Sequence, residues 1–291
     1  MLSKSTLLHL RIPFSFFLMP VFLFSISVSQ SFDWLDIALA FLAIHLFLYP
    51  ASNGYNSYYD KDEGSIGGLE KPPLVDKSLW NAAILFDGLA ILLGWFVSPL
   101  FALAMFLYGL ISKAYSYDKI RLKKYPIASW LVVGSFQGFF IFMVVQEGIG
   151  EESLASVWRW EILFPAILSS MMLLGSYPMT QIYQHEEDGK RGDLTLSRLL
   201  GIRGTFVFTM LFFGVAMAGF FTYYFSFQTT YHALALLGCA SPVLLYFFRW
   251  FFSVLKDEKN ADFRSTMRLN FISAICFNTF FLWCFLVQFF R

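Results

Sequence analysis

The segment WLDIALAFLAIHLFLYPASN, residues 34–53, runs without a break into GYNSYYDKDEG, residues 54–64. The first part holds 20 mostly apolar residues, about the length that an α-helix needs to cross the hydrocarbon core of a bilayer. The second part replaces this apolar character with amides, tyrosines and carboxylates. Carboxylates at the depth of a membrane usually line a water-filled cavity and indicate function. The segment therefore predicts a membrane-spanning helix with a chemically active end.

The composition extends this prediction to the whole chain. Of its 291 residues, 57% are hydrophobic and 14% are charged, whereas soluble domains carry about 25% charged residues. A soluble core of this size cannot hide 37 phenylalanines, but lipid accepts apolar surface on every side of a helix. The sequence has no basic block of the kind that binds nucleic acid. We therefore expect an all-α polytopic membrane protein that contacts lipid and no nucleic acid.

Nine apolar segments are candidates for spanning helices. The first could be a secretory signal, but it is long for one and eight further segments follow, so we expect it to be retained. The fourth is short and follows a turn at Ser98-Pro99, so the third and fourth could instead form a re-entrant hairpin. The predicted spans are residues 12–28, 34–53, 79–97, 99–113, 126–146, 160–182, 204–226, 231–252 and 269–290.

The distribution of lysine and arginine predicts the orientation. If each span crosses the membrane, 19 of the 21 basic residues lie on one side, and only Arg159 and Arg291 lie on the other. Basic residues collect in cytoplasmic loops. We therefore expect an integral protein of the plasma (inner) membrane, with its N-terminus and its long polar loops in the cytoplasm.

Two helix ends on this inner side carry similar polar residues. Asn56 and Asp60 are four residues apart at the end of the second span, and Gln184 and Asp188 are four apart at the end of the sixth. Residues four apart share one helix face. The repeat suggests two four-helix halves plus a ninth helix, with both acidic ends facing one cavity. Mg²⁺ is typically held by one or two carboxylates together with substrate phosphate oxygens; alternatively, these are ordinary solvated loop charges.

Four motifs, in this order along the chain, resemble those of the UbiA family of intramembrane prenyltransferases. Arg11 with Pro13 is similar to the family's entry into its first helix. The first acidic motif is NSYYDKD, residues 56–62, and the tyrosine-and-lysine loop is YSYDKIRLK, residues 115–123. The second acidic motif is EEDGKRGDLTL, residues 186–196, closing at Leu200-Gly201.

This resemblance implies a fold and an activity. The fold would be nine helices around a central cavity, forming a single domain over residues 1–291. The activity would be Mg²⁺-dependent transfer of an isoprenyl group from an isoprenyl diphosphate. The acceptor would be lipophilic, either an aromatic compound or a quinone or pigment precursor.

By position, the resemblance also implies a set of site residues. The metal would be held by Asn56, Asp60, Asp62, Gln184 and Asp188. Catalytic roles would fall to Asp60, Asp188 and Tyr115. The diphosphate would be bound by Arg11, Lys119, Arg121 and Lys190, although bases on the inner face are also expected from topology alone.

The motifs depart from the family pattern at two positions. Gly64 stands where the second carboxylate of the first motif is expected, and Gln184 replaces the first carboxylate of the second motif. The site could bind fewer metal ions, or Asp62, Glu63 and Glu187 could compensate. A third alternative is a non-catalytic binding or scaffold subunit. A transporter is less favoured because Asp87 is the only deep charge, and it should be paired, protonated or cavity-facing.

Overall fold

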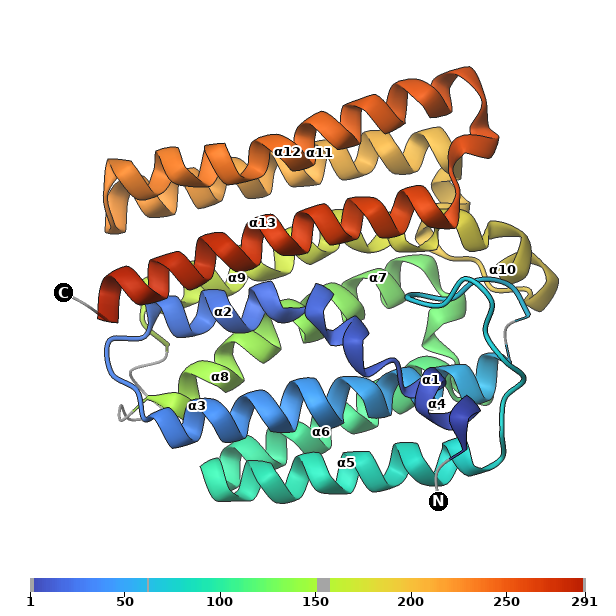
Figure 1. The fold of residues 1–291 in the computed structure, drawn as a ribbon, viewed down its shortest axis with the longest axis horizontal. Helices are drawn as coiled ribbons and strands as arrows, with labels where there is room; N and C mark the ends of the chain where they lie inside the picture. The colour runs from blue at the N-terminus through green and yellow to red at the C-terminus, as the bar shows by residue number, and fades with distance from the viewer. Residues whose placement is uncertain (1–2, 62, 151–157, 290–291) are drawn as a thin grey trace.

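The computed structural model describes residues 3–61, 63–150 and 158–289. In these residues the chain is all-α, with long helices lying side by side and no β-strand (Figure 1). The only extended pairing among them is a single bridge between Ile66 and Leu69. The predicted all-α fold is therefore confirmed.

The first span is bent. It comprises α1 (Lys4–Leu10), η1 (Ile12–Phe17) and α2 (Met19–Val28), with an angle of 42° between the part before and the part after Leu18. Arg11 ends α1 in the left-handed conformation with φ 47°, and Pro20 lies in the first turn of α2. A proline lacks the N–H that would continue the hydrogen bonding of the preceding turn, which accounts for the break.

The second span is longer than the apolar pattern predicts. Its parts α3 (Trp34–Phe41), the π-helical η2 (Leu42–Leu48) and α4 (Tyr49–Asp60) form one span of 27 residues. The helix thus continues seven residues beyond the predicted end at Asn53. Asn56 and Asp60 consequently lie on a rigid helix rather than in a loop.

The next two helices are both long enough to span. They are α5 (Ser78–Val97), with 20 residues, and α6 (Pro99–Ser116), with 18. Ser98 caps α6 by accepting a hydrogen bond from the Phe101 N–H, and Pro99 favours a helix start at this position. The two helices pack along each other as an antiparallel pair (Figure 1). Each is long and apolar enough to cross a membrane by itself, which favours two spans over a re-entrant hairpin.

The second half contains the remaining spans. The fifth is α7 (Pro126–Gly134), η4 (Ser135–Phe140) and α8 (Ile141–Ile149), preceded by the short η3 (Leu122–Lys124). The sixth is α9 (Trp160–Ser176), η6 (Tyr177–Gln184) and α10 (His185–Arg191). The last three are α11 (Leu196–Phe227), α12 (Thr230–Lys256) and, after η7 (Glu258–Asn260), α13 (Phe263–Phe289).

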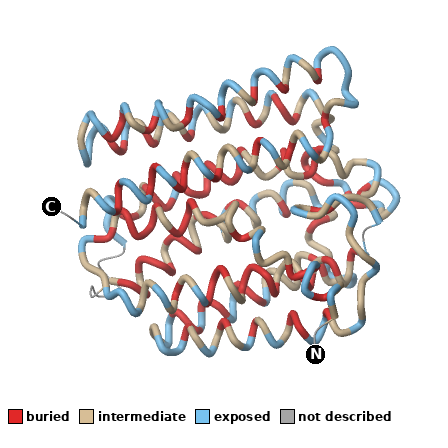
Figure 2. Tube along the Cα trace, viewed as in Figure 1, coloured by how far each residue is buried: buried red, intermediate tan, exposed pale blue. Residues whose placement is uncertain are grey.

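The described residues contain eight helices that are long and apolar enough to cross a membrane, and nine if the bent first span is counted. α13 packs against α2 and so joins the end of the chain to its beginning. Buried residues face the interior of the bundle, while the outer faces are exposed (Figure 2). Large apolar side chains such as Trp95, Leu211 and Leu245 are more than 60% exposed there. The protein is therefore an integral membrane protein whose outer surface suits lipid.

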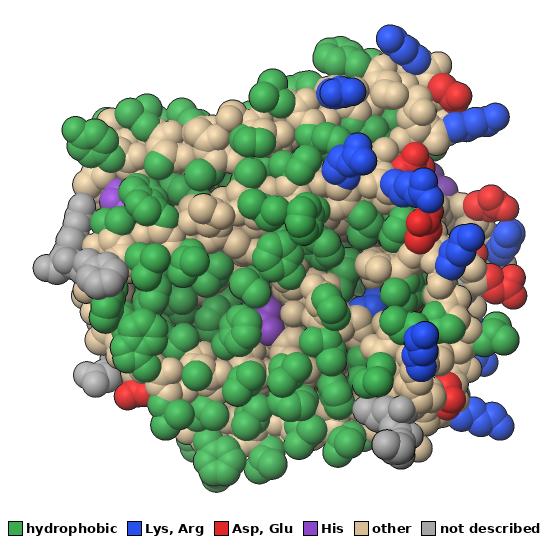
Figure 3. Space-filling model, viewed as in Figure 1, with side chains coloured by type: hydrophobic (Ala, Val, Ile, Leu, Met, Phe, Trp, Pro, Cys, Tyr) green, Lys and Arg blue, Asp and Glu red, His purple; other side chains and the backbone are tan. Residues whose placement is uncertain are grey.

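Charged side chains gather at one end of the bundle (Figure 3). The same end carries α1, α10 and the connection between α12 and α13 (Figure 1). The long loop between α4 and α5 also lies at this end. Polar chemistry is thus concentrated where α4 and α10 terminate.

Candidate active site

A cavity of about 200 Å³ lies at the charged end, between α4, α6 and the segment formed by η6 and α10. Asp60 and Asp188, from the two acidic motifs, both line it. They are 4% and 8% exposed respectively. The predicted convergence of the two helix ends on one cavity is thus present in the structure.

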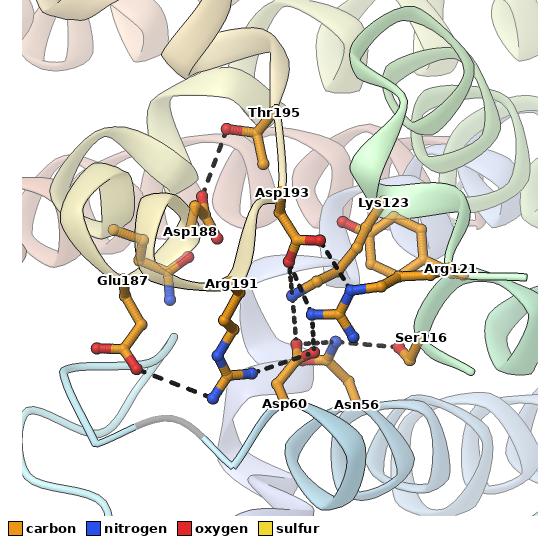
Figure 4. A network of polar contacts seen from close by, with 12 residues as sticks. Asn56, Asp60, Ser116, Arg121, Lys123, Glu187, Asp188, Arg191, Asp193 and Thr195 are labelled. Carbon is orange, nitrogen blue, oxygen red and sulfur yellow. Dashed lines mark hydrogen bonds and ion pairs between the residues drawn. The ribbon is translucent and has the colours of Figure 1, made fainter. Parts of the chain in front are cut away.

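Asp60 is surrounded by three cations. Its Oδ2 atom accepts a hydrogen bond of 2.7 Å from Lys123 Nζ. Its Oδ1 atom lies 3.4 Å from Arg121 Nη2 and 3.5 Å from Arg191 Nη1, without a hydrogen bond. Figure 4 shows these side chains converging on the end of α4. Buried charges in proteins are paired in this way.

A second carboxylate shares two of these cations. Asp193 accepts two hydrogen bonds of 2.8 Å from Arg121 and lies 3.1 Å from Lys123 Nζ. Burial alone would lower the pKa of Lys123, but Asp60 and Asp193 outweigh it and raise that pKa. Burial likewise raises the pKa of Asp193, but Arg121 and Lys123 reverse the effect, so its pKa is lowered overall. Both groups are therefore charged at neutral pH.

Two left-handed residues build this network from the local sequence. Arg121 adopts φ 47° and ends the turn after α6, so that η3 directs Lys123 into the protein interior. Gly192 adopts φ 73° at the end of α10, where glycine has no steric penalty. The reversal after Gly192 lets the Asp193 N–H donate to the carbonyl of Asp188, which returns the Asp193 carboxylate to the cavity side.

Asn56 and Asp188 complete the polar wall. The Asn56 amide nitrogen donates to Asp60 Oδ2 at 2.8 Å and to Ser116 Oγ at 3.0 Å. Its carbonyl oxygen is thus available to a ligand in the cavity. Asp188 accepts a hydrogen bond of 3.4 Å from the Thr195 hydroxyl.

The residues assigned to the diphosphate by resemblance separate into two groups. Arg11 lines the cavity and donates to the carbonyls of Asn53 and Gly67, both at 3.2 Å, and Arg121 lies in the network beside Asp60. Lys119 and Lys190 are exposed and do not line the cavity. Lys190 instead forms an exposed ion pair of 3.1 Å with Glu186.

Two other assigned residues lie as follows. Tyr115 lines the cavity, and its hydroxyl shares a hydrogen bond with the Tyr177 hydroxyl. Asp62 falls outside the described residues.

The two departures from the family pattern lie near each other. Gln184 lines the cavity and donates to the Ser65 carbonyl at 3.1 Å. A Cβ atom placed on Gly64 would lie 3.0 Å from Glu187 Oε2. The Glu187 carboxylate thus occupies the space that a side chain at position 64 would enter.

The loop after α4 covers the cavity. Ile66 and Gly67 line it, and Ile66 is only 3% exposed. Arg11 and Gln184 hold this loop through the hydrogen bonds described above, and Arg264 pairs with Glu70 at 2.9 Å. Arg11 and Gln184 therefore attach the loop to the site, and Arg264 attaches it to α13.

The oxygen atoms around the cavity fit one divalent cation that also binds phosphate. Asp60 Oδ1 and Gln181 Oε1 are buried and accept no hydrogen bond from any described residue. Hard cations such as Mg²⁺ take carboxylate and amide oxygens and complete their coordination with phosphate or water. No three His, Cys, Asp or Glu side chains in the described ranges lie close enough to hold a metal by themselves. A bound metal would therefore depend on phosphate oxygens.

An apolar cavity of about 510 Å³ adjoins the charged one. It lies between α2, α9, α11, α12 and α13 and is lined mostly by aliphatic and aromatic side chains. The two cavities lie side by side, and five residues line both: Phe14, Asn53, Gln137, Tyr177 and Thr180.

Sequence reasoning did not assign four residues of this site. Lys123 lies within the tyrosine-and-lysine loop, and Arg191 and Asp193 lie within the second acidic motif. The motifs therefore included these residues, but nothing in the sequence singled them out as site residues. Gln181 shares a helix face with Asp188 in the sequence, and this spacing was the available signal. Burial, which the sequence does not give, distinguishes Lys123 from its exposed neighbour Lys119.

The fold and the site together define an integral membrane protein with a charged cavity at one end and an apolar cavity beside it. The chain matches the model of the UbiA prenyltransferase family over residues 16–285. It therefore belongs to this family. A search of curated proteins finds no match.

Solved structures share this fold. A UbiA homologue from Archaeoglobus fulgidus bound to DMAPP and Mg²⁺ has 18% identity and a TM-score of 0.69, covering 98% of this chain and 100% of that one. An apo UbiA homologue from Aeropyrum pernix K1 has 19% identity and a TM-score of 0.70, with coverage of 93% and 97%. A structure of digeranylgeranylglyceryl phosphate synthase has 15% identity and a TM-score of 0.60, with coverage of 96% and 98%.

Proposed function

We propose that residues 1–291 act as one domain that transfers an isoprenyl group from an isoprenyl diphosphate to a lipophilic acceptor. The observation that carries this proposal is a charged cavity directly beside an apolar one, with five lining residues in common. A diphosphate suits the first and a hydrocarbon chain suits the second. Similar structures bound to GPP or DMAPP with Mg²⁺ support the choice of donor.

The diphosphate end would be bound by both metal and side chains. Asp60 and Asp188 would hold Mg²⁺, and the amide oxygens of Asn56 and Gln181 would be the other protein ligands. When bound, Mg²⁺ would neutralise charge on the diphosphate and make it a better leaving group. Lys123 and Arg11 would add two fixed positive charges to the same cavity.

The chemistry would occur where the two cavities join. The bond between the allylic carbon and the diphosphate oxygen would break, and its electron pair would leave with the diphosphate. The aromatic faces of Tyr115, Tyr177 and Phe136, which line the charged cavity, can stabilise the positive charge left on the allylic carbon. The acceptor would form a new bond to that carbon and lose a proton. The covering loop would exclude water during this step.

The acceptor and the orientation belong to the same proposal. An aromatic compound or a quinone or pigment precursor would reach the site from the lipid. The basic residues at the charged end support a cytoplasmic position for the N-terminus and the site. The membrane would then be the plasma membrane.

Purified protein in lipid nanodiscs, supplied with labelled geranylgeranyl diphosphate and a lipid extract, tests the proposal. We expect diphosphate release and a prenylated lipid by mass spectrometry, both abolished by EDTA and restored by Mg²⁺. Asp188→Asn and Asp60→Asn should lower turnover by about 100-fold or more, the size typical of losing one preorganised charge contact. Glu186→Gln is the matched control, because Glu186 lies on the same helix and its side chain is 86% exposed.

A non-catalytic binding subunit is the second candidate. The observation that favours it is the charge balance around Asp60, where Lys123, Arg121 and Arg191 already compensate the carboxylates without a metal. Such a subunit would bind isoprenyl diphosphates without releasing diphosphate. Binding without release across donors of several lengths and a full lipid extract would favour this candidate over the enzyme.

A further inference from the structure

Lys123 bridges two buried carboxylates at the charged end. Its ammonium nitrogen lies 2.7 Å from Asp60 Oδ2 and 3.1 Å from Asp193 Oδ2, and Figure 4 shows it between them. The two aspartates are 4% and 1% exposed. An ammonium group has three N–H donors, so two suffice for the carboxylates and one remains for a ligand in the cavity that Lys123 lines. Lys123 is thus a fixed cation in a setting of two carboxylates, which also suits Mg²⁺.

The two carboxylate oxygens of Asp60 differ in what they bind. The Oδ2 atom accepts hydrogen bonds from Lys123 at 2.7 Å and from the Asn56 amide at 2.8 Å, so both of its lone pairs are in use. The Oδ1 atom accepts no hydrogen bond from any described residue. To bridge two metal ions, Asp60 would have to offer one oxygen to each. Only Oδ1 can bind a metal without displacing a donor.

The other oxygens of the cavity complete the ligands of one ion. Gln181 is 5% exposed, and its Oε1 atom accepts no hydrogen bond from the part of the chain that the structure describes. Among the described residues, Asp60 and Asp188 are the carboxylates that line the cavity. Mg²⁺ typically takes one or two carboxylates and completes its coordination with substrate phosphate and water. The two aspartates therefore suffice for one ion.

A second ion would lack a carboxylate of its own in the described residues. Gln184 lines the cavity but has no formal charge, and its amide nitrogen donates to the Ser65 carbonyl at 3.1 Å. Gly64 has no side chain. The neighbouring Glu187 does not line the cavity and lies 3.8 Å from Arg191. The two departures from the family pattern thus remove ligands from the same site in which Lys123 supplies a positive charge.

We propose that the site binds one Mg²⁺ ion per chain, and that the Lys123 ammonium group takes the place of a second ion and binds the diphosphate directly. This inference rests on the proposed function, because it takes the diphosphate to bind in the charged cavity. It assigns the loss of the two motif carboxylates to a change in metal number, with the diphosphate site retained.

Counting bound Mn²⁺, a paramagnetic substitute for Mg²⁺, tests the inference without any turnover. Protein in nanodiscs is saturated with a non-reactive geranylgeranyl thiolodiphosphate, and bound Mn²⁺ is measured by electron paramagnetic resonance. We expect one Mn²⁺ per chain. Before saturation, the logarithm of analogue affinity should rise with the logarithm of Mn²⁺ concentration with a slope of about 1, because the slope counts the ions taken up with the ligand.

Two ions per chain in the unchanged protein would overturn the inference and leave the proposed function standing. Binding of the analogue without any Mn²⁺ would also overturn it. Failure of the analogue to bind at any Mn²⁺ concentration would instead overturn the proposed function, and the inference with it.

Lys123→Met/Gln184→Asp provides the reciprocal change, since it removes the ammonium group and supplies a carboxylate to the cavity. We expect two Mn²⁺ per chain, with the spectral broadening of two ions ~4 Å apart. Lys119→Met/Gln184→Asp is the matched control and should bind one, because Lys119 is exposed and does not line the cavity. Equal counts in the two variants would overturn the role of Lys123. If the first variant does not fold, the count for the unchanged protein decides.

Discussion

Lys123 is a buried lysine of the site, and its ammonium group pairs with two carboxylates. Its ammonium group lies 2.7 Å from Asp60 and 3.1 Å from Asp193. Removing one partner of a buried ion pair typically costs ~3–5 kcal/mol. Because Arg121 remains beside both carboxylates, we expect Lys123→Met to lower the free energy of unfolding by about 3 kcal/mol. We also expect isoprenyl diphosphate affinity to fall about tenfold, the loss of one charge-assisted contact.

Thermal unfolding in detergent and binding of a thiolodiphosphate analogue measure these two effects. Lys119→Met is the control, because Lys119 lies on the same loop but is exposed. The role assigned to Lys123 is wrong if the two variants behave alike.

The pH dependence of the same network follows from the directions of its pKa shifts. The pKa of Asp193 is lowered from 3.8, so its contribution is present above that pH and is lost as the pH falls through the folded value. The pKa of Lys123 is raised from 10.5, so its contribution is present below that pH and is lost as the pH rises through the folded value. The stability difference between the protein and Lys123→Met should therefore be constant from about pH 5 to 9.

Gly64 and Glu187 form a second residue-scale pair. The Glu187 carboxylate lies 3.0 Å from where the Cβ of residue 64 would stand. Gly64→Asp should therefore bring two carboxylates together and lower the melting temperature, whereas in Gly64→Asp/Glu187→Gln the repulsion is absent. We expect a coupling of at least about 0.5 kcal/mol between the two positions in a double-mutant cycle.

Gly64→Ala separates sterics from charge in this cycle, since the neighbour is the end of a flexible side chain and can move. Additive effects of Gly64→Asp and Glu187→Gln would show that the two positions do not compete for one space. The cycle therefore tests whether the Glu187 carboxylate, from the second motif, takes the place of the missing carboxylate at position 64 of the first motif.

Among the elements, α5 and α6 are joined by an ion pair within the membrane region. Asp87 on α5 accepts a hydrogen bond from Lys113 on α6, and Lys113 also lies 5.3 Å from the centre of the Tyr55 ring on α4. The expectation that Asp87 is paired is confirmed. Asp87 therefore has a structural partner in Lys113, and its deep position does not require a role in transport.

Removing either member of this pair leaves the other charge in an apolar layer, which costs ~3–5 kcal/mol for a buried pair. We expect Asp87→Leu and Lys113→Met each to lower the melting temperature clearly. The double variant should be more stable than the sum of the two losses implies, because neither charge is then left unpaired. Thermal unfolding of all four proteins in the same detergent measures this, and strictly additive losses would contradict it.

Elements were more readily predicted from the sequence than the side chains that they place. Apolar length fixed the positions of the spans because lipid imposes it. It did not fix the end of α4 at Asp60, since the last seven residues of that helix are polar and owe their conformation to packing. Lys123 was not ranked above Lys119 because the left-handed turn at Arg121 decides which lysine points inward. A single sequence does not reveal such a turn at a non-glycine residue.

At the scale of the whole molecule, α1 lies at the charged end of the bundle and α13 ends at the opposite end (Figure 1). This is consistent with an odd number of crossings and with the count of nine that includes the bent first span. The charged end carries the loop after α4, whereas the turn between α11 and α12 lies at the other end (Figure 1). The two loops should therefore face opposite sides of the membrane.

Cysteine labelling in intact cells tests this orientation. With Cys239, Cys276 and Cys284 replaced by serine, we introduce Lys71→Cys in the first loop or Gln228→Cys in the second; both positions are exposed. A membrane-impermeant maleimide should label the cysteine at 228 in intact cells and the one at 71 only after permeabilisation, because basic loops collect on the cytoplasmic side of membrane proteins. The reverse pattern would place the charged cavity outside the cell, away from cytoplasmic isoprenyl diphosphates. Labelling of both positions in intact cells would contradict a single orientation. The distribution of basic residues could then not be used to assign the side of the membrane on which the site lies.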